Sequence, residues 1–199
     1  MKRIYLLFVA TLLFPCLMAY GSNSETTLAT EPTNKANILV AYFSCTGNTR
    51  ALGAHVADAL KADLYEIQPE KPYTDADLNY RDSSSRASLE KNDAAVRPAI
   101  SGSVDNMEKY DIVFLGYPIW WGQAPRIIST FLESYDFSDK TIVPFCTSGS
   151  SGIGSSAENL HVLCADSATW LSGVRLNSGA SRNDVVKWIN GLDLGIIAE

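Results

Sequence analysis

Short, continuous apolar runs alternate along this chain with segments of helical periodicity, and this alternation constrains the fold more than any other feature. The first run, residues 37–43 (NILVAYF), is typical of a strand that is covered on both faces. In residues 48–61, apolar side chains recur at the spacing of one helix face. A strand, a helix and a second strand in this order predict a right-handed parallel unit.

The alternation continues to the end of the chain. Further strands are expected at residues 63–67, 111–117, 141–146 and 173–176. Further helices are expected to begin at Pro125, at a capping box formed by Ser155 and Glu158 (ending near residue 164), and after a cap at Ser181. We therefore predict an α/β fold, a doubly wound sheet of five parallel strands in a three-layer sandwich.

Residues 68–109 do not fit this scheme, because they are too many for a simple crossover and include three prolines. A helix around residues 75–91 is expected, since Leu78, Asp82, Ser85 and Leu89 fall on one face that is half apolar. Long segments of this kind often carry function, but the sequence does not indicate which.

Residues 1–21 have the layout of a secretory signal peptide. Lys2 and Arg3 precede an apolar run, and the small residues Ala19 and Gly21 precede a cleavage point before Ser22. Residues 22–36 are polar and are expected to form a flexible leader, followed by a domain at residues 37–199. We expect export, to the periplasm, with no stable membrane span after cleavage. The alternative is a retained N-terminal membrane anchor.

Charge and composition exclude several classes of function. The net charge of −6, without a basic patch, argues against a nucleic-acid partner. Two histidines and four scattered cysteines lack the spacing of a metal site. Cleavage after Gly21 would leave Cys45, Cys146 and Cys164, so at least one thiol stays free, and whether Cys146 and Cys164 pair is left open.

A loop rich in hydroxyl groups follows the first strand and directly precedes a helix. It contains Ser44, Cys45, Thr46, Gly47, Asn48 and Thr49. Unpaired N–H groups and the helix dipole make such a position suitable for a phosphate monoester. The loop is neither a P-loop nor a dinucleotide fingerprint. The alternative is a helix cap without a ligand.

Two adjacent tryptophans follow the third strand, in the loop Pro118, Ile119, Trp120, Trp121 and Gly122. A flat aromatic ligand stacked on an indole would explain them, and the alternative is that both cover the core. The loop after the fourth strand, residues 147–154, is small and flexible, and by itself resembles a linker. Because ligands of open α/β sheets bind beyond the carboxyl ends of the strands, the three loops together predict FMN.

The segments AYFSCTGNTR, FLGYPIWWGQAP and PFCTSGSSGIG resemble the three FMN-binding segments of the flavodoxin-like family, in particular the branch with a tryptophan-rich second loop. The resemblance covers about residues 37–192 and implies strand order 2-1-3-4-5 and noncovalent FMN. It implies that the phosphate is held by Ser44, Cys45 (through its backbone), Thr46, Gly47, Asn48 and Thr49. It further implies that Pro118, Ile119, Trp120, Trp121 and Gly122 flank one side of the ring, and that Thr147, Ser148, Gly149, Ser151 and Gly152 line the other. Ser148 stands where related sequences often carry a histidine.

Three functions remain open. The first is a low-potential electron carrier that serves redox partner proteins or small quinone-like acceptors. The second is an NAD(P)H-dependent reductase of quinones or nitro compounds that uses FMN. The third is an exported binding protein without a redox role. No side chain is assigned a catalytic role, because the flavin supplies the chemistry in the first two functions.

Overall fold

In a computed structural model of the chain, residues 36–199 are described. The predicted signal peptide, residues 1–21, and all but the last residue of the predicted leader, residues 22–36, lie outside the described residues. Among residues 36–199, no helix combines the length and the apolar character needed to cross a membrane.

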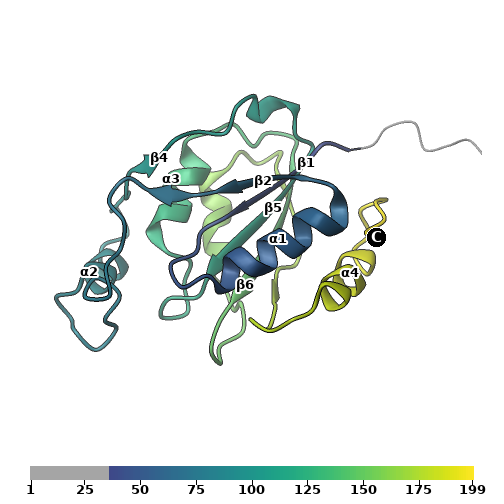
Figure 1. The fold of residues 1–199 in the computed structure, drawn as a ribbon. Helices are drawn as coiled ribbons and strands as arrows, with labels where there is room; N and C mark the ends of the chain where they lie inside the picture. The colour runs from purple at the N-terminus through teal and green to yellow at the C-terminus, as the bar shows by residue number, and fades with distance from the viewer. Residues whose placement is uncertain (1–35) are drawn as a thin grey trace, which may run out of the picture. The chain divides into compact units, whose positions relative to one another are not determined.

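One mainly parallel sheet forms the body of the domain (Figure 1). Its central strands are β2 (Asp63–Glu66), β1 (Ile38–Tyr42), β5 (Ile112–Pro118) and β6 (Thr141–Thr147), in this spatial order, with β7 (Thr169–Trp170) beyond β6. Counted along the chain without the small outlying strands β3 (Gln68–Pro69) and β4 (Ile100–Ser101), this is the order 2-1-3-4-5, so the predicted fold is confirmed.

The fifth position of the sheet differs in detail from the prediction of one strand at residues 173–176. It is shared by β7 (Thr169–Trp170) and β8 (Val174–Arg175), which both pair with β6. The pairing stops at Ile142 and resumes at Phe145. The interruption lies next to Pro144, which has no N–H group to donate to a neighbouring strand.

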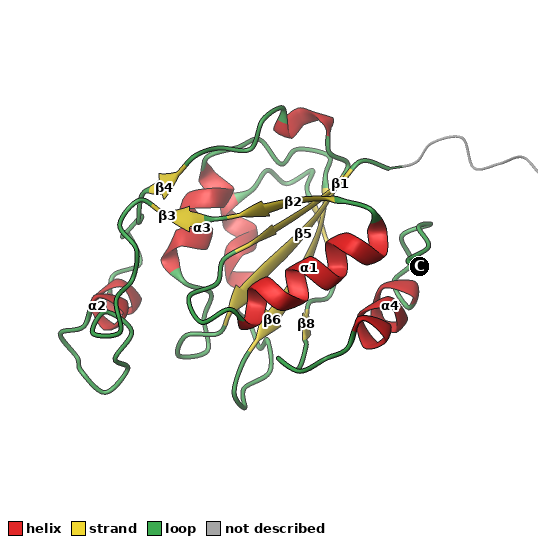
Figure 2. Cartoon of the chain, in the orientation of Figure 1, coloured by secondary structure: helices red, strands yellow, loops and turns green. Residues whose placement is uncertain are grey.

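Helices cover both faces of the sheet, as Figure 2 shows. The helices α1 (Asn48–Leu60) and α4 (Arg182–Asn190) lie on one face, and α3 (Arg126–Glu133) and the 3-10 helix η2 (Glu158–Leu163) lie on the other. Successive strand residues point to opposite faces. In β1, Val40 packs with Leu52 and Val185, whereas Leu39 packs in the other cluster with Ile127. Continuous burial of the strands therefore produces three layers.

Two of the predicted helices were wrong in type or length. Where a capped α-helix was expected over residues 155–164, the structure has a turn and then the 3-10 helix η2 (Glu158–Leu163), which has no side-chain cap. The neighbouring Ser156 is buried, where its hydroxyl donates to the carbonyl of Ile153 and pairs with the hydroxyl of Tyr117, and the helix that follows closes through bonds between residues three apart. The last helix does begin at a Ser181 cap, with Asp184 completing a capping box.

The segment that resisted prediction contains α2 (Arg86–Asn92) and little other regular structure. The helix is shorter than the expected 75–91, because Ser85 caps it and the residues before it form turns. The strands β3 (Gln68–Pro69) and β4 (Ile100–Ser101) pair in antiparallel fashion and close its base, and the 3-10 helix η1 (Met107–Lys109) leads into β5. Residues 70–99, here called the insertion, lie to one side of the sheet, at the end toward which the strands point (Figure 2).

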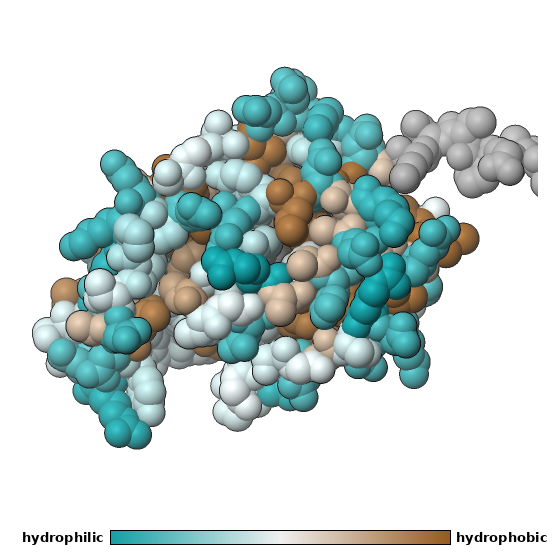
Figure 3. All heavy atoms as spheres, viewed as in Figure 1, coloured by the Kyte–Doolittle hydropathy of each residue, from teal (hydrophilic) through white to brown (hydrophobic). Residues whose placement is uncertain are grey.

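Hydrophilic side chains cover most of the surface that carries α1 and α4, and hydrophobic residues appear there only in small, separate patches (Figure 3). The apolar side chains of these two helices are instead buried against the sheet. This face therefore gives no sign of a large apolar docking surface.

Candidate functional site

A cavity of about 630 Å³ lies at the carboxyl end of the parallel strands. Three loops and the insertion line it, with Ser44, Cys45, Thr46, Thr49, Leu78, Tyr80, Ala87, Pro118, Ile119, Trp120, Trp121, Gly149 and Ser150. Its volume is within the range of small-molecule and cofactor sites. None of these lining residues is Asp, Glu, Lys, Arg or His.

The loop after β1 (Ser44–Thr49, the β1 loop) forms the hydroxyl-rich end of the cavity. Gly47 is the N-cap of α1 and has φ 87°, in the left-handed region where glycine is favoured. Its N–H donates to the hydroxyl of Ser44 at 3.1 Å, but no side chain caps the helix. The first N–H groups of a helix have no partner within it, so α1 offers donors and its positive dipole end to a ligand.

Two buried threonines connect the β1 loop to the end of β6. The hydroxyls of Thr49 and Thr147 lie 2.9 Å apart and form a hydrogen bond. Thr49 borders the cavity, whereas Thr147 supports it from behind. Thr46 is exposed, and its hydroxyl oxygen accepts a hydrogen bond from the Asn48 side chain at 3.3 Å. The Thr46 hydroxyl proton is thus available to a ligand.

Cys45 contributes a neutral side chain to the cavity. Burial raises the pKa of the Cys45 thiol to about 12, so it carries no charge at pH 7 and does not repel an anion. Cys45, Cys146 and Cys164 are all free thiols in residues 36–199, which answers the open question of a pair between the last two.

The tryptophan loop is a tight hairpin (Pro118–Gln123, the tryptophan hairpin). Trp120 and Gln123 exchange two backbone hydrogen bonds of 2.9 and 3.0 Å around a two-residue turn. Trp121 and Gly122 form that turn with φ values of 47° and 78°. A bulky residue rarely adopts a left-handed conformation, and such strain gathers at functional sites.

The two indoles have different surroundings. Trp120 is half-buried and meets Phe43 and Tyr73 edge-on, with ring centroids 5.6 and 5.4 Å apart. Trp121 is 38% exposed, and the Nζ atom of Lys91 lies 5.2 Å from its ring centroid. Both tryptophans border the cavity that also reaches Thr46 and Thr49. The alternative in which both only cover the core is therefore wrong.

The structure brings nine of the sixteen predicted site residues onto the cavity wall: Ser44, Cys45, Thr46, Thr49, Pro118, Ile119, Trp120, Trp121 and Gly149. The other seven lie in the same loops or at their ends without lining it: Gly47, Asn48, Gly122, Thr147, Ser148, Ser151 and Gly152. In the loop after β6, the Ser148 hydroxyl accepts a hydrogen bond from the N–H of Ser151, which folds that loop on itself.

Sequence reasoning missed four lining residues. Ser150 belongs to the predicted third loop, but Leu78, Tyr80 and Ala87 come from the insertion. The half-apolar face around Leu78 was a signal that this segment contacts something. Nothing in its spacing indicated that the contact is this cavity.

The lining residues fit FMN. Hydroxyl groups and a helix N-terminus suit a phosphoryl group, indoles suit a planar ring, and a neutral wall leaves both free of charge repulsion. A family model for flavodoxin matches residues 37–192. The chain belongs to the flavodoxin family. FMN, the predicted cofactor, is the cofactor of flavodoxins.

Solved structures agree with the assignment to the flavodoxins. A presumptive flavoprotein from Bacteroides uniformis is 46% identical, with a TM-score of 0.74, over 78% of this chain and 98% of that chain. One from Bacteroides eggerthii is 44% identical, with a TM-score of 0.73, over 78% and 96%. A flavoprotein from Lactobacillus acidophilus, solved in complex with FMN, is 23% identical with a TM-score of 0.56, over 77% and 99%, and shares the fold. The comparison with curated proteins gives no match.

Proposed function

We propose that this protein binds FMN without a covalent bond and transfers electrons at low potential to a redox partner protein or a small quinone-like acceptor. The observation that carries the proposal is the cavity itself, which is lined by hydroxyl donors of the β1 loop and two indoles of the tryptophan hairpin, and by no charged residue. The FMN complex of the flavoprotein from Lactobacillus acidophilus, which shares the fold, supports the choice of cofactor.

The β1 loop is suited to hold the phosphoryl group. The N–H groups of the first turn of α1 would donate to it, with the hydroxyls of Ser44 and Thr46 as further donors. Gly47 gives the backbone room, since a Cβ built on it meets no heavy atom within 4 Å. Dipoles and hydrogen bonds would then replace the cationic side chain that many phosphate sites use.

The tryptophan hairpin is suited to hold the ring. Trp120 and Trp121 would cover it from one side and exclude water, with Gly149 and Ser150 at the opposite loop. When bound, FMN supplies the ability to accept and return one or two electrons. The side chains then decide how the ring is oriented and which molecules reach it.

The charge distribution supports a low potential. Reduction adds negative charge to the ring, and the chain has a net charge of −6 with no cation in the cavity lining to offset it. A potentiometric titration of the FMN-loaded protein should give a second reduction step below that of free FMN. A step at or above the value of free FMN would contradict the proposal.

One observation favours reduction of small molecules as a second candidate. The insertion adds Leu78, Tyr80 and Ala87 to the wall, next to the tryptophans, and an apolar wall of this kind suits a planar organic acceptor. Steady-state consumption of NADPH with a quinone, in the presence of FMN, would favour this reductase function. If the bound flavin reacts with neither NADPH nor NADH, the reductase function is excluded and the electron-carrier function remains.

We also propose that the protein is exported. The proposal rests on the sequence of residues 1–21, which lie outside the described residues. A chain that crosses a membrane unfolded cannot carry a noncovalent cofactor, so FMN would be bound after export. Cell fractionation with N-terminal sequencing tests this: a cytosolic protein that begins at Met1 would contradict it.

A further inference from the structure

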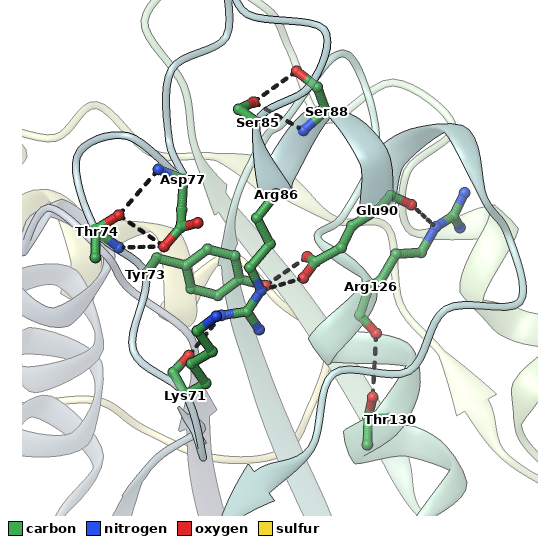
Figure 4. Close-up of polar contacts among 10 residues, drawn as sticks. All are labelled: Lys71, Tyr73, Thr74, Asp77, Ser85, Arg86, Ser88, Glu90, Arg126 and Thr130. Atoms are coloured by element: carbon green, nitrogen blue, oxygen red, sulfur yellow. Dashed lines mark hydrogen bonds and ion pairs between the residues drawn. The ribbon is translucent and has the colours of Figure 1, made fainter.

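A buried carboxylate lies at the centre of the insertion. Glu90, on α2, is 7% exposed, and its two carboxylate oxygens accept hydrogen bonds from separate donors. The Tyr73 hydroxyl donates to one oxygen at 2.6 Å, and Nε of Arg86 donates to the other at 2.7 Å (Figure 4). A buried charge is tolerated when it is paired and hydrogen-bonded in this way.

Arg86 also makes a cation–π contact with Tyr73. Its guanidinium carbon lies 3.9 Å from the centroid of the Tyr73 ring, and Nη1 donates to the carbonyl of Lys71 at 2.6 Å. Figure 4 shows the guanidinium over the ring and the carboxylate of Glu90 beside both. Tyr73, Arg86 and Glu90, here called the insertion triad, thus join α2 to the start of the insertion.

The insertion triad is in contact with the tryptophan hairpin. The Tyr73 ring meets the Trp120 ring nearly at right angles, at 79° and 5.4 Å, and Phe43 packs against both. Such edge-to-face contacts fix the plane of a ring as well as its position.

A second connection joins the C-terminal end of α2 to α3 and to the tryptophan hairpin. Arg126, on α3, donates to the backbone carbonyls of Glu90 and Lys91, each at 3.2 Å. The ammonium group of Lys91 then lies over the ring of Trp121. The helix that carries Glu90 is therefore linked to both indoles of the candidate site.

We propose that Tyr73, Arg86 and Glu90 are positioning residues that hold Trp120 in the orientation needed to stack on the flavin ring. This inference rests on the proposed binding of FMN. It assigns a role to the insertion, whose charged residues do not line the cavity themselves. Because the insertion triad contacts Trp120, we expect it to affect binding of the flavin ring, which FMN and riboflavin share, rather than binding of the phosphate, which FMN alone carries.

Binding of two flavins to the purified full-length protein tests the proposal. Riboflavin lacks the phosphate of FMN, so the two ligands separate the ring end from the phosphate end. We expect Glu90→Gln to weaken both ligands by the same factor, about threefold to tenfold, which corresponds to the loss of an edge-to-face contact. Quenching of flavin fluorescence gives both dissociation constants.

The exposed ion pair Arg97–Glu133 provides a matched control. It also joins the insertion to α3, at 2.6 Å, but it does not contact Trp120. Glu133→Gln should leave both dissociation constants within about twofold of wild type. Equal weakening by both substitutions would overturn the proposal, because a general loosening of the insertion would then explain the effect.

Tyr73→Phe covers the case in which Glu90→Gln fails to fold, as judged by near-ultraviolet circular dichroism. It keeps the ring and removes only the hydroxyl, so it should weaken both flavins less than Tyr73→Leu does. Wild-type affinity for both flavins in Tyr73→Leu would overturn the proposal. Failure of the wild-type protein to bind FMN would instead overturn the proposed function.

Discussion

The β1 loop and the insertion line the same cavity, but different forces hold them in place. The β1 loop connects a buried strand to the first turn of α1, so the backbone of two regular elements fixes it. The insertion has one short helix and is held by side chains, through the bonds of Glu90 and Arg126. A site can therefore combine a part whose geometry is local with a part that depends on long-range pairs.

The largest expected effect concerns the point where the two regions meet. Cys45 lies in the β1 loop, and burial, with a smaller contribution from Glu90, raises the pKa of its thiol from 9.0 to about 12, against a lowering by Arg86. At pH 8 the reactive thiolate should be about a thousandfold scarcer in the folded protein than in the unfolded chain. Alkylation by iodoacetamide, followed at Cys45 by mass spectrometry with and without urea, measures this.

The sign of the pH dependence follows from the same shift. Folding raises the pKa, so the stability contributed by the neutral thiol is present below pH 9 and is lost as the pH rises toward about 12. Labelling of the native protein at the rate of the unfolded chain would show that the insertion does not cover the β1 loop.

The next effect is on stability and concerns the insertion. Glu90→Ala removes the buried partner of Arg86, and we expect the free energy of unfolding to fall by about 3 kcal/mol. Urea denaturation without flavin measures it. Glu133→Ala, in the more exposed pair with Arg97, should cost less than about 1 kcal/mol. Similar losses in the two variants would mean that the burial of Glu90 is not what holds the insertion.

A third effect is on binding and concerns the β1 loop. Thr46→Val removes an exposed hydroxyl that is available to a phosphoryl group, so FMN affinity should fall by about 2 kcal/mol, or roughly thirtyfold. Riboflavin affinity should stay unchanged, in contrast to the insertion triad variants. Thr46→Ser keeps the hydroxyl and should bind FMN as wild type does. An equal loss for both flavins would contradict a phosphate site at this loop.

The smallest expected effect concerns the left-handed backbone conformation at Gly47 in the β1 loop. Gly47 has φ 87°, and Gly47→Ala should lower the free energy of unfolding by about 1 kcal/mol because a Cβ disfavours this conformation. Gly149 is a suitable control, since it has no positive φ and no atom near a built Cβ. Thermal unfolding of both variants compares them, and an equal effect would argue against conformational strain at Gly47.

The same contrast explains what could be predicted from the sequence. The central strands and the β1 loop followed from local patterns, because the apolar runs define the strands and Gly47 precedes a helix. The tryptophan hairpin was placed at the correct edge for the same reason. The order of the strands followed only from the resemblance to the flavodoxin-like family. Bonds between distant residues were not visible: Tyr73 and Glu90 are 17 residues apart, and Arg126 and Glu90 are 36 apart.

The turns within the insertion further hid its structure. Asp77 accepts bonds from the backbone and hydroxyl of Thr74, and Asp82 does the same for Ser84. Such local bonds between side chain and backbone compete with helix formation. The helix predicted over residues 75–91 was therefore too long, and its expected face was wrong: Leu78 lies in the turns and lines the cavity, whereas Leu89, on α2, is exposed.

The uncharged wall of the cavity has a consequence for how ionic strength affects cofactor loading. Fixed dipoles act over short distances, where dissolved salt screens little, so the dissociation rate of a phosphorylated ligand should hardly change between dilute and concentrated buffer. The net charge of −6 acts at longer range and repels an anion on approach. Added salt should therefore speed the association of FMN with the protein and raise its affinity by the same factor, while leaving its dissociation nearly constant.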